Sequence, residues 1–310
     1  MKPWLHIIGV GDDGLASLKS EQMQLLNTAK LIIGGERHLA MLPGGVKADI
    51  MAWPSPLMKM VEDVVQMRGK QVVILATGDP MHYGIGVTFA KRLAPDDYKI
   101  YSNPSAFSLA AARLGWDLSR VTTLTLHGRP LELLIPHLFN GAQILALSDD
   151  GTTPAKVAAL LDDLGYGASA LTVLEHMGGI DEKQHTDSAG NWIGRKTADL
   201  NTIALICHKE ASVEAMSTTP GLKDEAFCHD GQLTKREIRA ATLSALAPFP
   251  GQLLWDVGAG SGSIGIEWMR LDARNRAIAI ETHASRLEFI EQNRLTLGVP
   301  GLEFIKGRAP

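Results

Sequence analysis

Short apolar segments that end at glycine-containing turns alternate with amphipathic segments in the first part of this chain. Residues 4–10, 31–33 and 72–76 are such apolar runs. The run at 72–76 is typical of a strand that is buried on both faces of a parallel sheet. Between the runs, residues 18–29 and 57–67 carry apolar side chains at helical spacing. This alternation predicts an α/β layered domain with a mostly parallel sheet.

A second set of alternating elements follows residue 116. Strands are expected over residues 121–126, 143–147, 171–174 and 202–206, with helices over 131–139 and 153–165. The polar, glycine-containing residues 178–194 favour a hairpin or an excursion. Residues 209–231 lack clear periodicity and include Pro220 and Gly221, so they are the best linker candidate. The expected division is a domain at 1–210 (subdomains about 1–116 and 117–210), a linker at 211–230 and a further domain at 231–310.

The last part of the chain carries a nucleotide-type motif. A predicted strand at 252–257 runs into a loop with Gly258, Gly260 and Gly262, and a predicted helix at 263–269 follows at once. This order aims backbone N–H groups at a ligand and lets it approach without obstruction from Cβ atoms. Glu281 follows the loop by about 20 residues, where such folds bind ribose hydroxyls.

Two cofactor classes share this strand, loop and helix. Dinucleotide enzymes need glycine or alanine at position 263, which here is Ser263. The spacing instead reads Asp-x-Gly-x-Gly-x-Gly from Asp256, and it resembles the first motif of the class I S-adenosylmethionine-dependent methyltransferases. A glycine-rich turn that binds no ligand is the remaining interpretation.

The first part of the chain resembles the tetrapyrrole (corrin/porphyrin) methylases. The similarity lies in the opening loop GVGDDG at 9–14, the run GDPMHYGIG at 78–86 and the run NPSAFSLAAARLG at 103–115. The join HDGQLTKREIRA at 229–240 resembles a fusion of such a methylase to a class I partner domain in cobalamin synthesis. The implied fold is a tetrapyrrole methylase fold, with two α/β subdomains and a cleft between them, followed by a partial Rossmann-like class I methyltransferase domain.

The resemblance also implies which residues bind S-adenosylmethionine. In the first domain the cofactor lies in the cleft, and the matching positions are Gly9, Gly11, Asp12, Asp79, His82, Ser105 and Ala106. In the second domain the positions around a second cofactor are Thr234, Gly258, Gly260, Gly262, Glu281 and Ala309.

The activity that the resemblance implies is C-methylation of a precorrin at ring carbons 5 and 15, with loss of carbon dioxide from the acetate at carbon 12. The first domain is associated with carbon 5, and the second with carbon 15 and the decarboxylation. The family also tends to form dimers through the first domain. Class I domains have about seven strands, whereas residues 231–310 show three. We therefore expect a partial second domain with an unpaired strand edge, and a chain that retains mainly the first methylation.

A precorrin carries many carboxylates, so basic side chains are expected along its binding site. The candidates are Arg37, Arg113 and Arg129, with Lys235, Arg236 and Arg239 near the join. Each is alternatively a solvated surface charge. His82 and His127 are candidates for proton transfer or for packing. No catalytic residue is assigned, because a sulfonium leaving group makes alignment and exclusion of water sufficient for much of the rate. No metal site is expected from the cysteines, Cys207 and Cys228.

The net charge and the hydropathy of the chain argue against nucleic acid and membranes as binding partners. The chain has 30 Lys and Arg against 34 Asp and Glu, a formal net charge of −4, so no general attraction to nucleic acid or to an anionic membrane is expected. No apolar run approaches a membrane span, which favours a cytoplasmic protein. The alternatives are methylation of RNA or protein on the same fold, an NAD-dependent dehydrogenase, and a non-catalytic cofactor-binding or regulatory protein.

Overall fold

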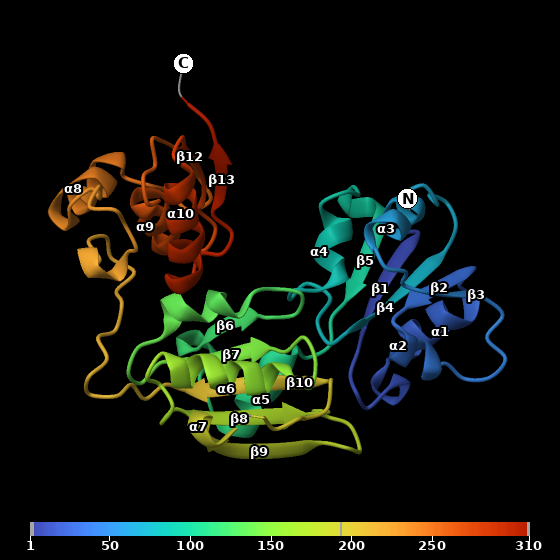
Figure 1. Ribbon diagram of the computed structural model, residues 1–310. Coiled ribbons are helices and arrows are strands. Elements are labelled where there is room, and N and C mark those ends of the chain that lie inside the picture. The colour runs from blue at the N-terminus through green and yellow to red at the C-terminus, as the bar shows by residue number, and fades with distance from the viewer. Residues whose placement is uncertain (1–2, 193, 309–310) are drawn as a thin grey trace.

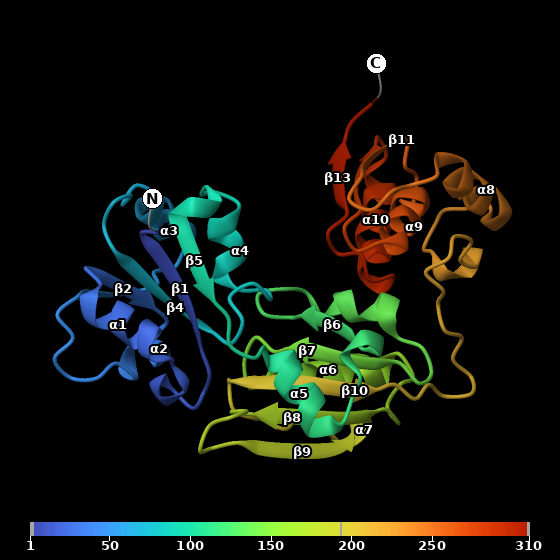
Figure 2. The same cartoon turned by 180° about the vertical axis from the view of Figure 1, so that it is seen from behind.

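The computed structural model describes residues 3–192 and 194–308. It contains two α/β subdomains and a third α/β unit, each with its own sheet and its own core (Figure 1). The two sheets of the first 206 residues lie beside each other, and the third unit sits against the second subdomain (Figure 2).

The first sheet has the order β3-β2-β4-β1-β5, and every neighbouring pair is parallel, as expected. Helices α3 and α4 cover one face and α1 and α2 the other, so alternate strand residues enter two separate cores. The strands are β1 (Leu5–Val10), β2 (Leu31–Gly34), β3 (Asp49–Ala52), β4 (Val72–Thr77) and β5 (Tyr98–Tyr101); the helices are α1 (Ser20–Thr28), α2 (Glu36–Ala40), α3 (Met58–Val65) and α4 (Ile85–Ala90).

The second sheet has the order β6-β7-β10-β8-β9, and only the β6–β7 pair is parallel. The sequence pattern set no strand directions for this second set, and in the structure β10 enters antiparallel between β7 and β8. Within residues 178–194, predicted as a hairpin or an excursion, β9 turns back to pair antiparallel with β8. The strands are β6 (Thr122–Thr125), β7 (Gln143–Leu147), β8 (Ala170–Glu175), β9 (Lys183–Ser188) and β10 (Asn201–Ile206).

Helices on both faces complete the second subdomain. Helix α5 (Ala106–Leu114) packs on one face, although the predicted boundary at about residue 116 assigns it to the first subdomain. Helices α6 (Thr153–Asp163) and α7 (Ala189–Trp192) cover the other face. The expected helix at 131–139 is a 3-10 helix, η4 (Leu131–His137), because Pro136 cannot donate an α-helical hydrogen bond.

The third unit is a parallel sheet with the order β11-β12-β13. Leu222 and Phe227, within the predicted linker, are buried in its core, so the end of that stretch packs with this unit. Among the described strands β11 pairs with β12 alone, and its Leu253, Trp255 and Val257 are exposed. The elements are β11 (Leu253–Val257), β12 (Arg276–Glu281), β13 (Glu303–Lys306), α8 (Arg236–Leu246), α9 (Ser263–Leu271) and α10 (Ala284–Thr296).

Candidate functional site

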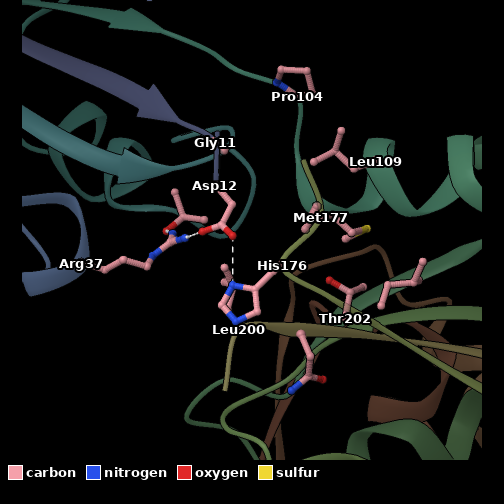
Figure 3. Close-up of a pocket in the computed structure, with 14 residues that line it drawn as sticks. Gly11, Asp12, Arg37, Pro104, Leu109, His176, Met177, Leu200 and Thr202 are labelled. Carbon is pink, nitrogen blue, oxygen red and sulfur yellow. Dashed lines mark hydrogen bonds and ion pairs between the residues drawn. The ribbon is translucent and has the colours of Figure 1, made fainter. Parts of the chain in front are cut away.

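A small cavity lies between the first two subdomains, at the carboxyl ends of β1 and β4 (Figure 3). This is the edge at which parallel α/β sheets bind ligands. The first subdomain contributes Gly11, Asp12, Arg37, Thr77 and Gly78, and the second contributes Ala106, Leu109, His176, Met177 and Thr202, among others. The cavity measures about 50 Å³. Its lining is largely apolar, with a few charged side chains at one end.

Asp12 joins the two subdomains at the charged end of this cavity (Figure 3). Its carboxylate accepts a hydrogen bond from Arg37 of the first subdomain, and His176 Nδ1 of the second lies 2.9 Å from its other oxygen. Gly179 faces the same carboxylate, and a Cβ there would lie 2.3 Å from Asp12 Oδ2. His176 adopts a left-handed φ of 49°, which is uncommon for a residue with a side chain. The contact between Asp12 and His176 therefore depends on the loop after β1 and on the loop after β8.

The glycines of the opening loops allow three backbone segments to meet beside the cavity. A Cβ on Gly9 would lie 1.9 Å from the Gly78 carbonyl oxygen. Gly78 itself has a φ of 57°, and its Cβ would lie 3.0 Å from the Pro104 carbonyl oxygen. Only glycine fits these contacts. Ser105 then caps α5 by accepting a hydrogen bond from the Ser108 N–H at 3.2 Å.

Asp79 shapes the loop after β4 rather than lining the cavity. Its carboxylate accepts hydrogen bonds from the Met81 N–H at 2.8 Å and from Ser102 Oγ at 3.1 Å. The ring of His82, three residues further along this loop, packs against the rings of Tyr83 and Phe107. Of the predicted residues of the first domain, Gly11, Asp12, Ala106 and Arg37 line the cavity, while Gly9, Asp79, His82 and Ser105 lie in the adjoining loops.

The other two predicted arginines differ in what they contact. Arg113 donates two hydrogen bonds to Glu182, from Nε at 2.7 Å and from Nη2 at 2.9 Å. Its guanidinium is therefore already paired, and it holds the loop after β8. Arg129 is exposed and lies 5.9 Å from the centre of the Tyr83 ring.

Sequence reasoning missed His176 and Met177, which directly follow the buried strand β8. A histidine and a methionine between a buried strand and Gly178-Gly179 are a signal that could have indicated a binding edge.

The third unit holds a second candidate site at the glycine loop. Gly258, Gly260 and Gly262 have φ values of 80°, 60° and 80°, so all three require the left-handed freedom of glycine. A Cβ on Gly258 would meet nothing within 4 Å, and one on Gly260 would meet only the Gln232 carbonyl oxygen at 3.8 Å. The loop is therefore open on the side that a ligand would approach.

Glu281 anchors this loop from the end of β12. It accepts hydrogen bonds from the N–H groups of Gly260 at 2.8 Å, Thr282 at 2.7 Å and His283 at 3.0 Å. Burial raises the pKa of Glu281, but these donors and the His283 ring outweigh it and lower that pKa to about 2. In contrast, burial raises the pKa of Asp256 above its usual value. Glu281 is thus a fixed negative charge beside the loop.

The basic residues near the join do not share one role. Arg239 is wholly buried and pairs with Glu267 at 2.9 Å and with Asp224 at 2.7 Å, so it stabilises the core and is unavailable to a substrate. Lys235 pairs with Asp224 at 3.2 Å, and Arg236 donates to the Gly221 carbonyl at 2.7 Å. Thr234 is exposed in the segment that passes the glycine loop, and Ala309 lies outside the described residues.

Across residues 3–192 and 194–308, no helix is both long and apolar enough to cross a bilayer. Nor does that part of the chain bring three or more His, Cys, Asp or Glu side chains together as metal ligands.

Comparison with known proteins places the chain in a class. Residues 4–191 match the Tetrapyrrole (Corrin/Porphyrin) Methylases, and residues 225–310 match the Precorrin methyltransferase domain. The chain therefore belongs to the tetrapyrrole methylase family, and the expected fold is confirmed.

Particular relatives match different shares of the chain. A precorrin-6Y C(5,15)-methyltransferase (decarboxylating) from Sinorhizobium sp is 45% identical over 310 residues, which are all of this chain and 75% of that protein. Two shorter relatives come from Salmonella typhimurium. Its cobalt-precorrin-7 C(5)-methyltransferase is 26% identical over 58% of this chain and 89% of its own length. Its cobalt-precorrin-6B C(15)-methyltransferase (decarboxylating) is 33% identical over 29% of this chain and 47% of its own length.

Proposed function

We propose that this chain is an S-adenosylmethionine-dependent methyltransferase that acts on a precorrin of cobalamin biosynthesis. It methylates ring carbons 5 and 15 and removes the carboxyl group of the carbon 12 acetate. The observation that carries the proposal is the 45% identity over the whole chain to a protein with that activity. The two candidate sites support it, since each methylation needs a cofactor site.

The cofactor fits the chemistry of both sites. When bound, S-adenosylmethionine supplies a methyl group on a positively charged sulfonium. In the cleft, Ala106, Leu109 and Met177 offer apolar surface for an adenine, and Thr202 and the Gly11 backbone offer polar groups. In the third unit the open side of Gly258 and Gly260 is a cradle that a Cβ would fill. We propose that these residues, with Gly262 and Glu281, hold the cofactor.

The residues of the cleft position and shield the reacting groups. Asp12 is held by Arg37 and His176, so its carboxylate keeps one orientation beside the cavity. The apolar lining excludes water, which would otherwise solvate the electron-rich ring carbon. Arg129 is suited to bind a peripheral carboxylate of the substrate, whereas Arg37 is paired with Asp12. We assign no general base.

Binding and product assays test this proposal on the 310-residue chain. Isothermal titration should show S-adenosylhomocysteine binding and no NAD binding; NAD binding without S-adenosylhomocysteine binding would overturn the proposal. Mass spectrometry of the precorrin product then counts methyl groups and detects loss of carbon dioxide. If the first methylation predominates, as we expect, most of the product should carry one added methyl group and no loss of carbon dioxide. Methylation of RNA or protein but not of precorrin would favour the alternative substrates.

We further propose that the chain works in the cytoplasm as a dimer formed through the first domain. The family resemblance supports the dimer, and the composition supports the location. Analytical ultracentrifugation of the full chain tests the dimer, and a monomer across the concentration range contradicts it. Cell fractionation tests the location.

A further inference from the structure

The loop between β4 and α4 holds an exposed aromatic side chain at the boundary between the methylase subdomains. Tyr83 has a left-handed φ of 57°, and 48% of its surface is exposed. Its neighbours fix this conformation. Gly86 N–H donates to the Pro80 carbonyl at 2.9 Å, and a Cβ on Gly84 would lie 2.6 Å from the same oxygen. A bulky residue kept in a disfavoured conformation by its surroundings points to a function for its side chain.

A stack of rings supports Tyr83 from behind. The His82 ring lies 5.3 Å from the Tyr83 ring in a stacked arrangement, and 4.6 Å from the Phe107 ring. Phe107 is buried and directly follows Ala106, which lines the cavity. The His82 ring therefore lies between the exposed Tyr83 ring and the buried Phe107.

Tyr83 also reaches the second subdomain. Its hydroxyl donates to the Thr123 carbonyl at 3.2 Å, so the ring spans the gap between the subdomains. The β4–α4 loop thus lies beside β6 and the loop that follows it (Figures 1 and 2).

Arg129 stands beside the ring and carries an uncommitted charge. Its guanidinium carbon lies 5.9 Å from the centre of the Tyr83 ring. Within the described ranges no carboxylate pairs with Arg129, whereas the nearby His127 pairs with Asp149 at 3.1 Å. The other predicted arginines are paired, Arg37 with Asp12 and Arg113 with Glu182. Arg129 is therefore ready to accept an anionic group from a ligand.

We propose that Tyr83 and Arg129 form the substrate platform of the first active site. The Tyr83 ring stacks on one face of a conjugated tetrapyrrole, and Arg129 binds one of its peripheral carboxylates through two N–H groups. This assignment rests on the proposed function and names Tyr83 as a residue that positions the substrate. A flat aromatic face beside an unpaired guanidinium matches a flat polycarboxylate.

Titration with uroporphyrin, a flat tetrapyrrole with eight carboxylates, tests the platform on the full chain. Stacking shifts and weakens the porphyrin absorption band, which reports binding directly. We expect Tyr83→Leu to weaken uroporphyrin binding about tenfold. Tyr83→Phe, which keeps the ring, should bind about as well as the native chain. Arg129→Gln should weaken binding and reduce its dependence on salt concentration. The affinity for S-adenosylhomocysteine should stay unchanged in all three variants.

The matched control is Phe139→Leu, which removes another exposed aromatic ring, 55% exposed, from the second subdomain. Because Tyr83 is strained, Tyr83→Asn serves as a second variant that tolerates the left-handed conformation. In assays with precorrin, the platform variants should raise KM more than they lower kcat. Equal uroporphyrin affinity in the native chain, Tyr83→Leu and Tyr83→Asn overturns the platform while leaving the proposed function intact. A native chain that binds S-adenosylhomocysteine but no tetrapyrrole overturns both.

Discussion

At the scale of single residues, His38 shows how the cleft depends on protonation. Its ring is buried, and Nε2 lies 3.2 Å from Thr77 Oγ1 beside Arg37. Burial, followed by the charge of Arg37, lowers the pKa of His38 to about 4, and the opposing effect of Asp12 is smaller. The ring is therefore neutral at neutral pH, and adding a proton to it would place a second positive charge next to Arg37.

This pKa predicts a stability change in acid. Between about pH 6.5 and pH 4 the unfolded chain binds a proton at His38 that the folded chain does not bind, so the free energy of unfolding falls as the pH falls. The loss from this residue is at most about 3 kcal/mol. Hydrogen exchange of β2 and β4 amides at about pH 7 and about pH 5 measures it. His38→Gln should show a smaller decrease in protection than the native chain, and equal decreases would contradict the assignment.

The contact between Asp12 and His176 predicts a change in binding kinetics. This contact crosses the cleft between the two subdomains at the charged end of the cavity, so we expect it to hinder the entry of S-adenosylhomocysteine. His176→Asn removes this contact and still tolerates the left-handed backbone. We expect stopped-flow measurements to show S-adenosylhomocysteine associating and dissociating several-fold faster. His185→Asn, which alters an exposed histidine 3.8 Å from Glu175, is the control. Unchanged rates in His176→Asn would show that the contact does not limit opening.

At the scale of elements, the glycine loop after β11 allows a matched pair of substitutions. Gly260 and Gly231 both have positive φ, 60° and 92°, and both have open space at the Cβ position. Each change to alanine should therefore cost about 1 kcal/mol of backbone strain. Only Gly260→Ala places a methyl group where the cofactor is proposed to approach. Calorimetric titration should show that Gly260→Ala loses one of two S-adenosylhomocysteine sites, whereas Gly231→Ala keeps both. Two intact sites in Gly260→Ala would contradict the loop's role.

The elements that could be predicted are those whose own residues decide their structure. The apolar run at 72–76 is a buried parallel strand, and the glycines of the last loop stand before a helix as expected. Strand β3 was missed because all four of its residues are exposed, which leaves no buried pattern to detect. The hydrophobic pattern of β10 could not predict its direction, because a buried apolar strand has the same pattern in parallel and antiparallel pairs.

The candidate sites also contain some features that the local sequence predicts and others that only the packing of the chain determines. Gly258, Gly260 and Gly262 lie close together in sequence, so their spacing alone indicates a shared backbone conformation. The contact of His176 with Asp12 joins positions 164 residues apart, and only the packing of two subdomains brings them together. The pairing of Arg113 with Glu182 was hidden for the same reason, since it depends on how the loop after β8 folds back on α5.

At the scale of the whole molecule, the third unit contacts the second subdomain closely at Gly298. Gly298, just after α10, has a φ of 75° and lies against η4. A Cβ there would lie 2.4 Å from Pro136 Cδ and 2.8 Å from the Glu132 carbonyl oxygen. Beside this contact, burial and then the charge of Arg270 lower the pKa of His137. The two backbones therefore approach each other closely at this point, where a side chain at position 298 would not fit.

Substitution of this glycine should loosen the molecule between its units. Gly298→Ala cannot keep the present contact, because the Pro136 ring and the η4 backbone have no room to yield. Trypsin should then cleave after Lys209, in the segment that joins the units, several-fold faster than in the native chain. Gly301→Ala is the control in the same turn, since its Cβ would meet only Met269 Cε at 3.8 Å. Equal cleavage rates in both variants and in the native chain would show that the units are held together elsewhere. Unchanged S-adenosylhomocysteine affinity in Gly298→Ala would show that each site is built within its own unit.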